Sequence, residues 1–270
     1  MLDDPSFVSA QYQTTDPLQA RIALHKRFST NPILWYVWLY DRVPLDGQGR
    51  LLEVGCGPGD LWVENQDRLP DGWSFFLSDL HPSMVDQAQQ RIGRRSCWVY
   101  MLADAQAIPF GSAEFDLVVA NHMLYHTADP DQVLQDIARV LKPGGWFLTA
   151  TNGPNHLLEL RQLMSRFLPE SWFAEDTGQE PAGLPSFNLE NGNTWLRPHF
   201  TEIEASRHPT SLRVTEVEPL LDYIRSHFPG RIEADEEMIQ PITEFLKRDI
   251  AEHGAFNISK EVGCIIGRKR

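Results

Sequence analysis

The sequence predicts an α/β fold in which a doubly wound, mainly parallel sheet is covered by helices on both faces. Short apolar segments recur from Arg50 onward, they do not alternate apolar with polar residues, and helix-like segments separate them. A strand that is apolar on both sides is buried on both sides, as in a parallel sheet between two layers of helices. The first of these segments also ends in a glycine-rich turn, at the sheet edge where such folds bind ligands.

Five strands and three helices are expected between residues 50 and 151. The expected strands are 50–54, 73–79, 97–104, 115–121 and 145–151. The expected helices are 61–69, 82–92 and 130–141. Pro82 stands at a first helical position, which helices favour. Apolar residues of the third helix follow helical spacing, and Pro143 and Gly144 end it.

Two regions depart from this alternation. The N-terminal part predicts helices over 18–28 and 32–43, and residues 153–200 form an insertion with a helix over 155–168, a loop over 174–185 and a short helix within 188–200. The sheet continues with either 201–207 or 211–215, followed by helices over 216–228 and 238–254 and a strand over 262–269. We therefore expect a helical lid segment over residues 1–43 and one domain over 44–270, with a lid and substrate insertion at about 153–200.

The composition narrows the class of protein. The 270 residues are 42% hydrophobic, which is enough for a sizeable core, and the formal net charge of −13 disfavours nucleic acid as a partner. No apolar run approaches the roughly 18 to 20 residues of a membrane-spanning helix, and the first residues lack the pattern of an export signal. The three scattered cysteines have no metal-ligand spacing. We expect a cytoplasmic protein without a metal site or a disulfide framework.

The turn after the first strand, LEVGCGPGD, predicts a cofactor that carries positive charge and no phosphate. A dinucleotide fingerprint would require glycine at position 60, where the sequence has Asp60. Glu53, Asp60 and Glu64 place negative charge around the turn. A pyrophosphate would be repelled there, whereas S-adenosylmethionine has a sulfonium and an ammonium against one carboxylate. Acids at the ends of the next two strands suit the nucleoside part of S-adenosylmethionine. Asp79 suits the ribose hydroxyls, and Asp104, followed by Ala105, suits the adenine amino group.

Five ordered motifs carry a family resemblance: LEVGCGPG, SDLHPSM, LADAQAIPF, FDLVVANHMLYH and LKPGGWFLTATNG. Together they resemble the class I S-adenosylmethionine-dependent methyltransferases, in particular the small-molecule branch typified by quinone-biosynthesis C-methyltransferases. The resemblance implies a Rossmann-like sheet of seven strands in the order 3-2-1-4-5-7-6, with the seventh strand antiparallel. It also implies that Glu53 lies near the methionine ammonium of the cofactor. The segment after the fourth strand would border the methionine group and the acceptor.

The predicted site follows from the motifs and this resemblance. The residues expected to bind the cofactor are Arg21, Glu53, Gly55, Cys56, Gly57, Gly59, Asp79, Leu80, Asp104, Ala105 and Asn121. The residues predicted to be catalytic are His126, His122 and Tyr125, with His126 the first choice as a base.

Structural alternatives stay open at several of these positions. Asp79 also suits the N-cap of the helix that starts at Pro82. Arg21, one turn from His25, either pairs with the cofactor carboxylate or lies on a solvated helix face. Four aromatic residues of the second N-terminal helix either pack in the core or wall a pocket: Trp35, Tyr36, Trp38 and Tyr40.

The predicted function is methyl transfer to a small or medium-sized organic acceptor, mainly by proximity and orientation, which leaves S-adenosylhomocysteine as product. One alternative is an enzyme of the same fold that binds S-adenosylmethionine but catalyses another reaction, such as a cyclisation. A nucleic-acid methyltransferase is less favoured, because residues 120–126 read ANHMLYH instead of an Asn/Asp-Pro-Pro-Tyr/Phe motif.

Overall fold

The computed structural model describes residues 16–171, 187–228 and 236–270, which belong to two compact units. The first, here called the helical unit, comprises Met1–Leu34, Asn155–Ala182 and Pro209–Glu261. The second, here called the sheet unit, comprises Trp35–Pro154, Gly183–His208 and Val262–Arg270. The predicted insertion is thus divided, since its helix falls in the helical unit and residues 187–200 fall in the sheet unit. The predicted loop over 174–185 lies outside the described residues, and the roles of the two lid segments stay predictions.

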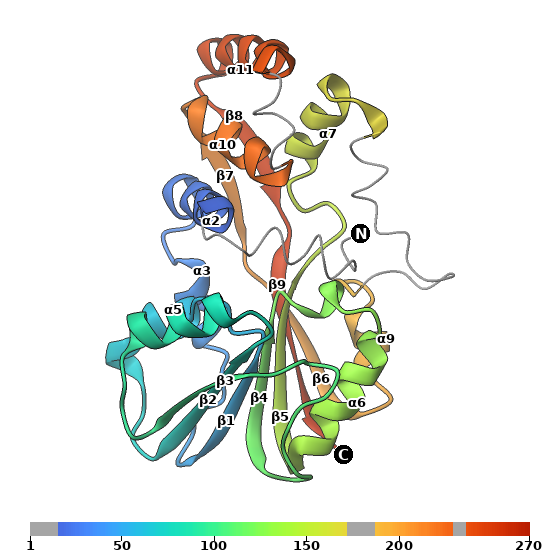
Figure 1. Cartoon of the computed structure of the whole chain (residues 1–270). Coiled ribbons are helices and arrows are strands. Elements are labelled where there is room, and N and C mark those ends of the chain that lie inside the picture. The colour runs from blue at the N-terminus through green and yellow to red at the C-terminus, as the bar shows by residue number, and fades with distance from the viewer. Residues whose placement is uncertain (1–15, 172–186, 229–235) are drawn as a thin grey trace. The chain divides into compact units, whose positions relative to one another are not determined.

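A seven-stranded sheet forms the centre of the sheet unit (Figure 1). Its order is β3-β2-β1-β4-β5-β9-β6, and β9 runs antiparallel to both of its neighbours. In chain order, the seventh strand of this sheet is β9 and the sixth is β6, so the predicted order is confirmed. The strands are β1 (Gly49–Val54), β2 (Trp73–Asp79), β3 (Trp98–Leu102), β4 (Phe115–Asn121), β5 (Leu141–Asn152), β6 (Phe200–Arg207) and β9 (Val262–Lys269).

Both faces of the sheet are buried along its central strands, as the mainly apolar segments predict. Successive residues of a strand point to opposite faces. Leu51 and Leu117 therefore belong to one core with α3 (Trp35–Tyr40), α4 (Asp60–Val63) and α5 (Pro82–Ile92). Leu52 and Val118 belong to the other core with α6 (Pro130–Val140) and α9 (Gly192–Leu196), which lie on the same side of the sheet in Figure 1.

Two predicted helices are shorter than expected. The helix expected over 61–69 is wrong in its extent, because the chain forms only α4 and the 3₁₀ helix η1 (Gln66–Arg68). The buried amide of Asn65 donates to the carbonyls of Leu61 and Tyr36, and such side-chain bonds to the backbone compete with helix continuation. The helix expected over 32–43 is limited to α3.

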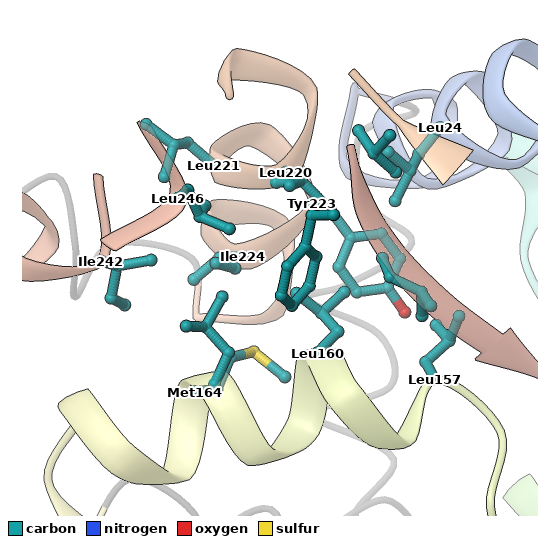
Figure 2. Close-up of a cluster of buried hydrophobic side chains, with 14 of the residues drawn as sticks. Leu24, Leu157, Leu160, Met164, Leu220, Leu221, Tyr223, Ile224, Ile242 and Leu246 are labelled. Carbon is teal, nitrogen blue, oxygen red and sulfur yellow. The ribbon is translucent and has the colours of Figure 1, made fainter. Parts of the chain in front are cut away.

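The helical unit has a core of its own, shown in Figure 2. The described elements of the helical unit are α2 (Asp16–Phe28), α7 (Leu158–Phe167), α10 (Glu218–His227), η3 (Glu236–Ile239), α11 (Gln240–His253) and the antiparallel pair β7 (Thr210–Val214) and β8 (Phe256–Lys260). Leu160 and Met164 of α7 pack with Leu220 and Ile224 of α10 and with Leu246 of α11.

The structure resolves the two candidate strands that follow the insertion. Residues 200–207 join the large sheet as β6, whereas residues 210–214 form β7 in the small sheet. The sequence prediction missed β8, whose five residues alternate between buried and exposed positions. None of the helices in the described parts of the chain is long and apolar enough to cross a membrane.

Replacing Gly263 by alanine is expected to destabilise the protein by about 2 to 3 kcal/mol, the upper part of the range for overpacking. Gly263 lies in β9 between Thr151 and Arg207, and a Cβ there would overlap the backbone oxygen of Ser206. Urea denaturation measures the effect. Gly111→Ala is the matched control, because its Cβ would meet only the far end of the Glu114 side chain. An unchanged midpoint for Gly263→Ala would contradict the strand packing described here.

Candidate functional site

The turn between β1 and α4 exposes backbone at the carboxyl end of the first strand. Gly55, Gly57 and Gly59 all have positive φ angles, of 70°, 53° and 77°. A Cβ on Gly57 would meet nothing within 4 Å, so the backbone there leaves room for a ligand to approach closely. The amide of Gly57 donates to Asp79 Oδ2 at 2.9 Å, which ties the turn to the end of β2.

The charge around the turn is less negative than the sequence alone suggests. Arg91 of α5 forms an ion pair with Asp60 at 2.7 Å and donates to the carbonyl of Pro58 at 2.8 Å. Sequence reasoning missed Arg91, because its distance along the chain gives no sign that α5 returns to the turn. Two further acids of the site, Glu53 and Asp79, are buried at the strand ends.

Glu53 is the most deeply buried acid of the site, with 2% of its surface exposed. Its carboxylate accepts hydrogen bonds from Trp62 Nε1 at 2.5 Å and from Asn121 Nδ2 at 2.9 Å. Burial raises the pKa of Glu53 to about 8, against the opposing effect of these two donors, and Asp79 and Asp60 add to the increase. A nearby positive charge would therefore stabilise the ionised form strongly.

Asn121 completes this acidic side of the site. Its Nδ2 donates to Glu53, while its Oδ1 is buried and has no hydrogen-bond partner among the residues that the structure describes. A buried acceptor without a donor is rare in folded proteins and points to a missing group. An ammonium fits this place, since it donates hydrogen bonds and neutralises Glu53. The observation supports the predicted binding of the methionine group of S-adenosylmethionine beside Glu53 and Asn121.

Asp79 connects the glycine turn with the start of α5. Its Oδ2 accepts from Gly57, and its Oδ1 accepts from the amide of His81 at 2.9 Å. Burial raises the pKa of Asp79, and these two backbone donors lower it. The alternative role of Asp79 as the N-cap of α5 is wrong, because that position is held by His81. Contact with the ribose stays a prediction, now with a carboxylate whose orientation is fixed.

The residues predicted to contact the adenine follow β2 and β3. Leu80 is 57% exposed and Leu102 is 55% exposed, so two apolar side chains lie uncovered next to the strand ends. Exposed Asp104 accepts a hydrogen bond from the amide of Gln106 at 2.9 Å, and Ala105 is buried. An apolar surface with an acid beside it suits a flat base with an exocyclic amino group. The adenine contacts stay predictions.

The residues predicted to border the reaction follow β4 as a group. His122 has a φ of 52°, unusual for a residue other than glycine, and its amide donates to Ala150 of β5. Tyr125 and His126 belong to the 3₁₀ helix η2 (Leu124–His126). The ring of Tyr125 lies 4.4 Å from that of His126 and 6.4 Å from that of His122. The structure thus brings the three predicted residues together, while their catalytic role stays a prediction.

Cys56 has the properties of a small buried residue of the turn. Its thiol contacts the carbonyl of Gly57, and burial raises the pKa of the thiol. A thiol that resists ionisation is a poor nucleophile. Any contribution of Cys56 to binding would come from its backbone.

Arg21 belongs to the helical unit, where it has a structural partner. Its Nε donates to Ser226 Oγ at 3.0 Å and its Nη2 donates to the carbonyl of Ser226 at 2.6 Å, near the end of α10. A cation at a helix C-terminus is stabilising. Arg21 is therefore bonded to α10 and does not simply face solvent, as the alternative assumed. Its contact with the cofactor stays a prediction.

The aromatic residues of α3 divide between the two expected roles. Trp38 and Tyr40 are buried in the core, as the packing alternative predicts. Trp35 is only partly buried, and its ring lies 5.5 Å from that of His122, next to the residues after β4. Burial, together with Asp60 and Glu53, raises the pKa of Tyr36. Sequence reasoning left open which of the four residues border the site.

Comparisons with known proteins cover the part of the chain that contains this site. The family model described as a methyltransferase domain matches residues 52–149, which include the glycine turn and the residues after β4. Malonyl-[acyl-carrier protein] O-methyltransferase of Pseudescherichia vulneris is 32% identical over 179 residues, which are 60% of this chain and 69% of that enzyme. The chain belongs to the class I S-adenosylmethionine-dependent methyltransferases.

Other similarities to methyltransferases are more limited. The malonyl-[acyl-carrier protein] O-methyltransferase of Legionella pneumophila is 33% identical over 43% of this chain but only 40% of its own length. The phosphoethanolamine N-methyltransferase 2 of Haemonchus contortus, solved with S-adenosyl-L-methionine, has a TM-score of 0.60 and 21% identity over 100% of this chain and 60% of that chain. At this identity the methyltransferase structure shows a shared fold.

Proposed function

We propose that the protein transfers a methyl group from S-adenosylmethionine to a small or medium-sized organic acceptor. The buried pair of Glu53 and Asn121 carries the proposal, because an ionisable carboxylate and an acceptor without a donor together suit the ammonium of the cofactor. When bound, the cofactor supplies a methyl group activated by a positively charged sulfur.

The chain's own contribution is to bind, orient and exclude water. Asp79 and the glycine turn would hold the ribose, and Leu80 and Asp104 the adenine. Orientation of this kind supplies about 7 to 11 kcal/mol, whereas a general base adds roughly 10²- to 10⁴-fold. His126, with His122 and Tyr125 beside it, is our candidate for accepting a proton from the methyl acceptor. The reaction does not require such a base when the acceptor is already a good nucleophile.

The choice of acceptor is proposed to depend on segments outside the shared region. Residues 1–43 and about 153–200 fall outside the match to the methyltransferase family model. Two of the proteins named above are malonyl-[acyl-carrier protein] O-methyltransferases, which is consistent with a small acyl acceptor. The net charge of −13 opposes a nucleic acid in this role.

The first test is whether the purified protein binds S-adenosylhomocysteine in preference to NAD, measured by calorimetry. We expect binding of S-adenosylhomocysteine and none of NAD at the same concentrations. The second test incubates the protein with S-adenosylmethionine and a panel of small carboxylic acids, amines and phenols, followed by mass spectrometry. A product that gains one methyl group supports the proposal. Consumption of an acceptor without gain of a methyl group would favour a different reaction, such as a cyclisation.

A further inference from the structure

Trp35, the first residue of α3, has an unusual polar atom. Its indole Nε1 is buried and has no hydrogen-bond partner among the residues that the structure describes. Leaving a buried donor without an acceptor costs about 1 to 3 kcal/mol, so such a donor calls for an explanation from its surroundings. The ring is fixed by aromatic neighbours, since it stacks on Trp38 at 5.4 Å and lies 5.5 Å from His122 and 5.7 Å from His208. The indole N–H is therefore a fixed donor in the sheet unit.

Contacts of the next residue place the start of α3 beside the cofactor-binding residues. The carbonyl of Tyr36 accepts a hydrogen bond from Asn65 at 3.0 Å. Burial and the nearby carboxylates of Asp60 and Glu53 raise the pKa of the Tyr36 hydroxyl. His122, against the ring of Trp35, follows β4, the neighbour of β1 in the sheet. Ligands of doubly wound sheets bind beside the first strand, where the order of the strands reverses, so Trp35 borders that place.

The charges of the site are arranged for a zwitterion. Glu53 and Asn121 Oδ1 suit the ammonium of the methionine group, which leaves its carboxylate in need of donors. Arg42 stacks over the Trp38 ring at 3.5 Å from the ring centre and donates to the carbonyl of Trp38 at 2.7 Å. Arg42 forms no ion pair with any acid in the described residues. Positive charge therefore lies next to the stacked pair of Trp38 and Trp35.

We propose that the indole N–H of Trp35 donates a hydrogen bond to the methionine carboxylate of the bound cofactor. The role of carboxylate ligand, which sequence reasoning gave to Arg21, thus goes to a residue of the sheet unit. The inference rests on the cofactor and not on the proposed acceptor, so it is testable before any acceptor is known.

The test compares S-adenosylhomocysteine with its decarboxylated analogue, which keeps the amine, ribose and adenine. Trp35→Phe preserves an aromatic ring against Trp38 and His122 but removes the donor. A hydrogen bond to a charged group contributes about 1.5 to 3 kcal/mol, so we expect Trp35→Phe to weaken binding of S-adenosylhomocysteine by roughly tenfold or more. The affinity for the decarboxylated analogue is expected to change by less than about twofold. Both are measured by calorimetry.

Trp73→Phe is the matched control. Trp73 Nε1 is likewise buried without a hydrogen-bond partner in the described residues, but Trp73 starts β2, at the other end of the strand from Asp79. We expect Trp73→Phe to bind both ligands like the wild type. A third variant, Arg21→Gln, tests whether Arg21 holds the carboxylate instead.

Three results of the binding comparison would overturn the proposal. Equal weakening of both ligands by Trp35→Phe would assign Trp35 to packing alone, and unchanged binding of both would remove its role. Selective loss of S-adenosylhomocysteine in Arg21→Gln but not in Trp35→Phe would return the carboxylate to Arg21. A measurement on the wild type guards against a variant that fails to fold. In ¹⁵N NMR, the indole resonance of Trp35 should shift downfield with S-adenosylhomocysteine and stay in place with the decarboxylated analogue, and a resonance that ignores both ligands would contradict the proposal.

Discussion

Replacing Asp79 by alanine is expected to lower the affinity for S-adenosylhomocysteine by at least about a hundredfold. The variant loses two backbone bonds together, from Gly57 and from His81, as well as the proposed contact with the ribose hydroxyls. Hydrogen bonds to a charged group contribute about 1.5 to 3 kcal/mol each, and the Gly57 bond also holds the turn in position. The loss therefore combines a missing ligand contact with a turn that is no longer tied to β2.

Calorimetry with S-adenosylhomocysteine and with its 2′,3′-dideoxy analogue separates these effects, because the analogue lacks the ribose hydroxyls and responds only to the displaced turn. Asp79→Asn keeps one acceptor oxygen and is expected to fall between the wild type and the alanine variant. Asp116→Asn is the matched control: Asp116 also accepts from a backbone amide, that of Arg50, and pairs with Lys142, but it lies near the start of β4. It should lose stability and retain affinity. Near-wild-type affinity of Asp79→Ala would remove the ribose assignment.

The sheet was predictable because its signals are local. Mainly apolar segments such as residues 115–121 favour burial on both faces, and the turn residues after them indicate where each strand ends. The same logic places Glu53, Asp79 and Asn121 at one sheet edge, since the carboxyl ends of parallel strands lie together. The strand order came from the family resemblance, because strand sequences do not encode which neighbour they pair with.

Contacts between distant segments were not predictable. Nothing in the sequence shows that Arg91 returns to Asp60, or that Trp62 donates to Glu53, because both pairs depend on how α4 and α5 pack. The small sheet was missed for a related reason. The residues of β8 form a strand only when paired with β7, and five alternating residues are a weak signal alone. The division of the chain into two units likewise depends on contacts that bring residues 155–171 together with 209–228.

Replacing Glu53 by glutamine is expected to weaken binding of S-adenosylhomocysteine by roughly thirtyfold at pH 8, because the ligand ammonium loses its charged partner. The Glu53→Gln variant should still fold. The amide oxygen of the substituted side chain can accept from Trp62, and a rotated Asn121 amide can accept from its NH₂ group, so Trp62 keeps its partner and only Asn121 Nδ2 turns away from its former one. This variant therefore separates charge from hydrogen bonding better than alanine does.

The raised pKa of Glu53 also predicts how the free energy of unfolding changes with pH. Burial raises the pKa of Glu53 from 4.5 in the unfolded chain to about 8 in the folded protein. The folded state therefore holds more protons between these values, and the free energy of unfolding of the wild type should fall as pH rises from about 4.5 to 8, by up to about 1.4 kcal/mol per unit. The Glu53→Gln variant should lack this contribution to the pH dependence of the free energy of unfolding. Urea denaturation of both proteins at several pH values measures the difference.

Binding should show the opposite trend in the wild type. The ligand ammonium favours ionised Glu53, so binding below pH 8 releases a proton, and the affinity should rise with pH and level off above about 8. Calorimetry in buffers of different ionisation enthalpy counts the released proton. Asp60→Asn is a comparison variant at the same sheet edge: because Asp60 adds to the increase in the pKa of Glu53, its loss should lower the pH at which the affinity levels off while the proton release remains. An affinity independent of pH in the wild type, or an unchanged pH profile in Glu53→Gln, would show that Glu53 carries no proton that the cofactor displaces, and the acidic side of the site would then need another explanation.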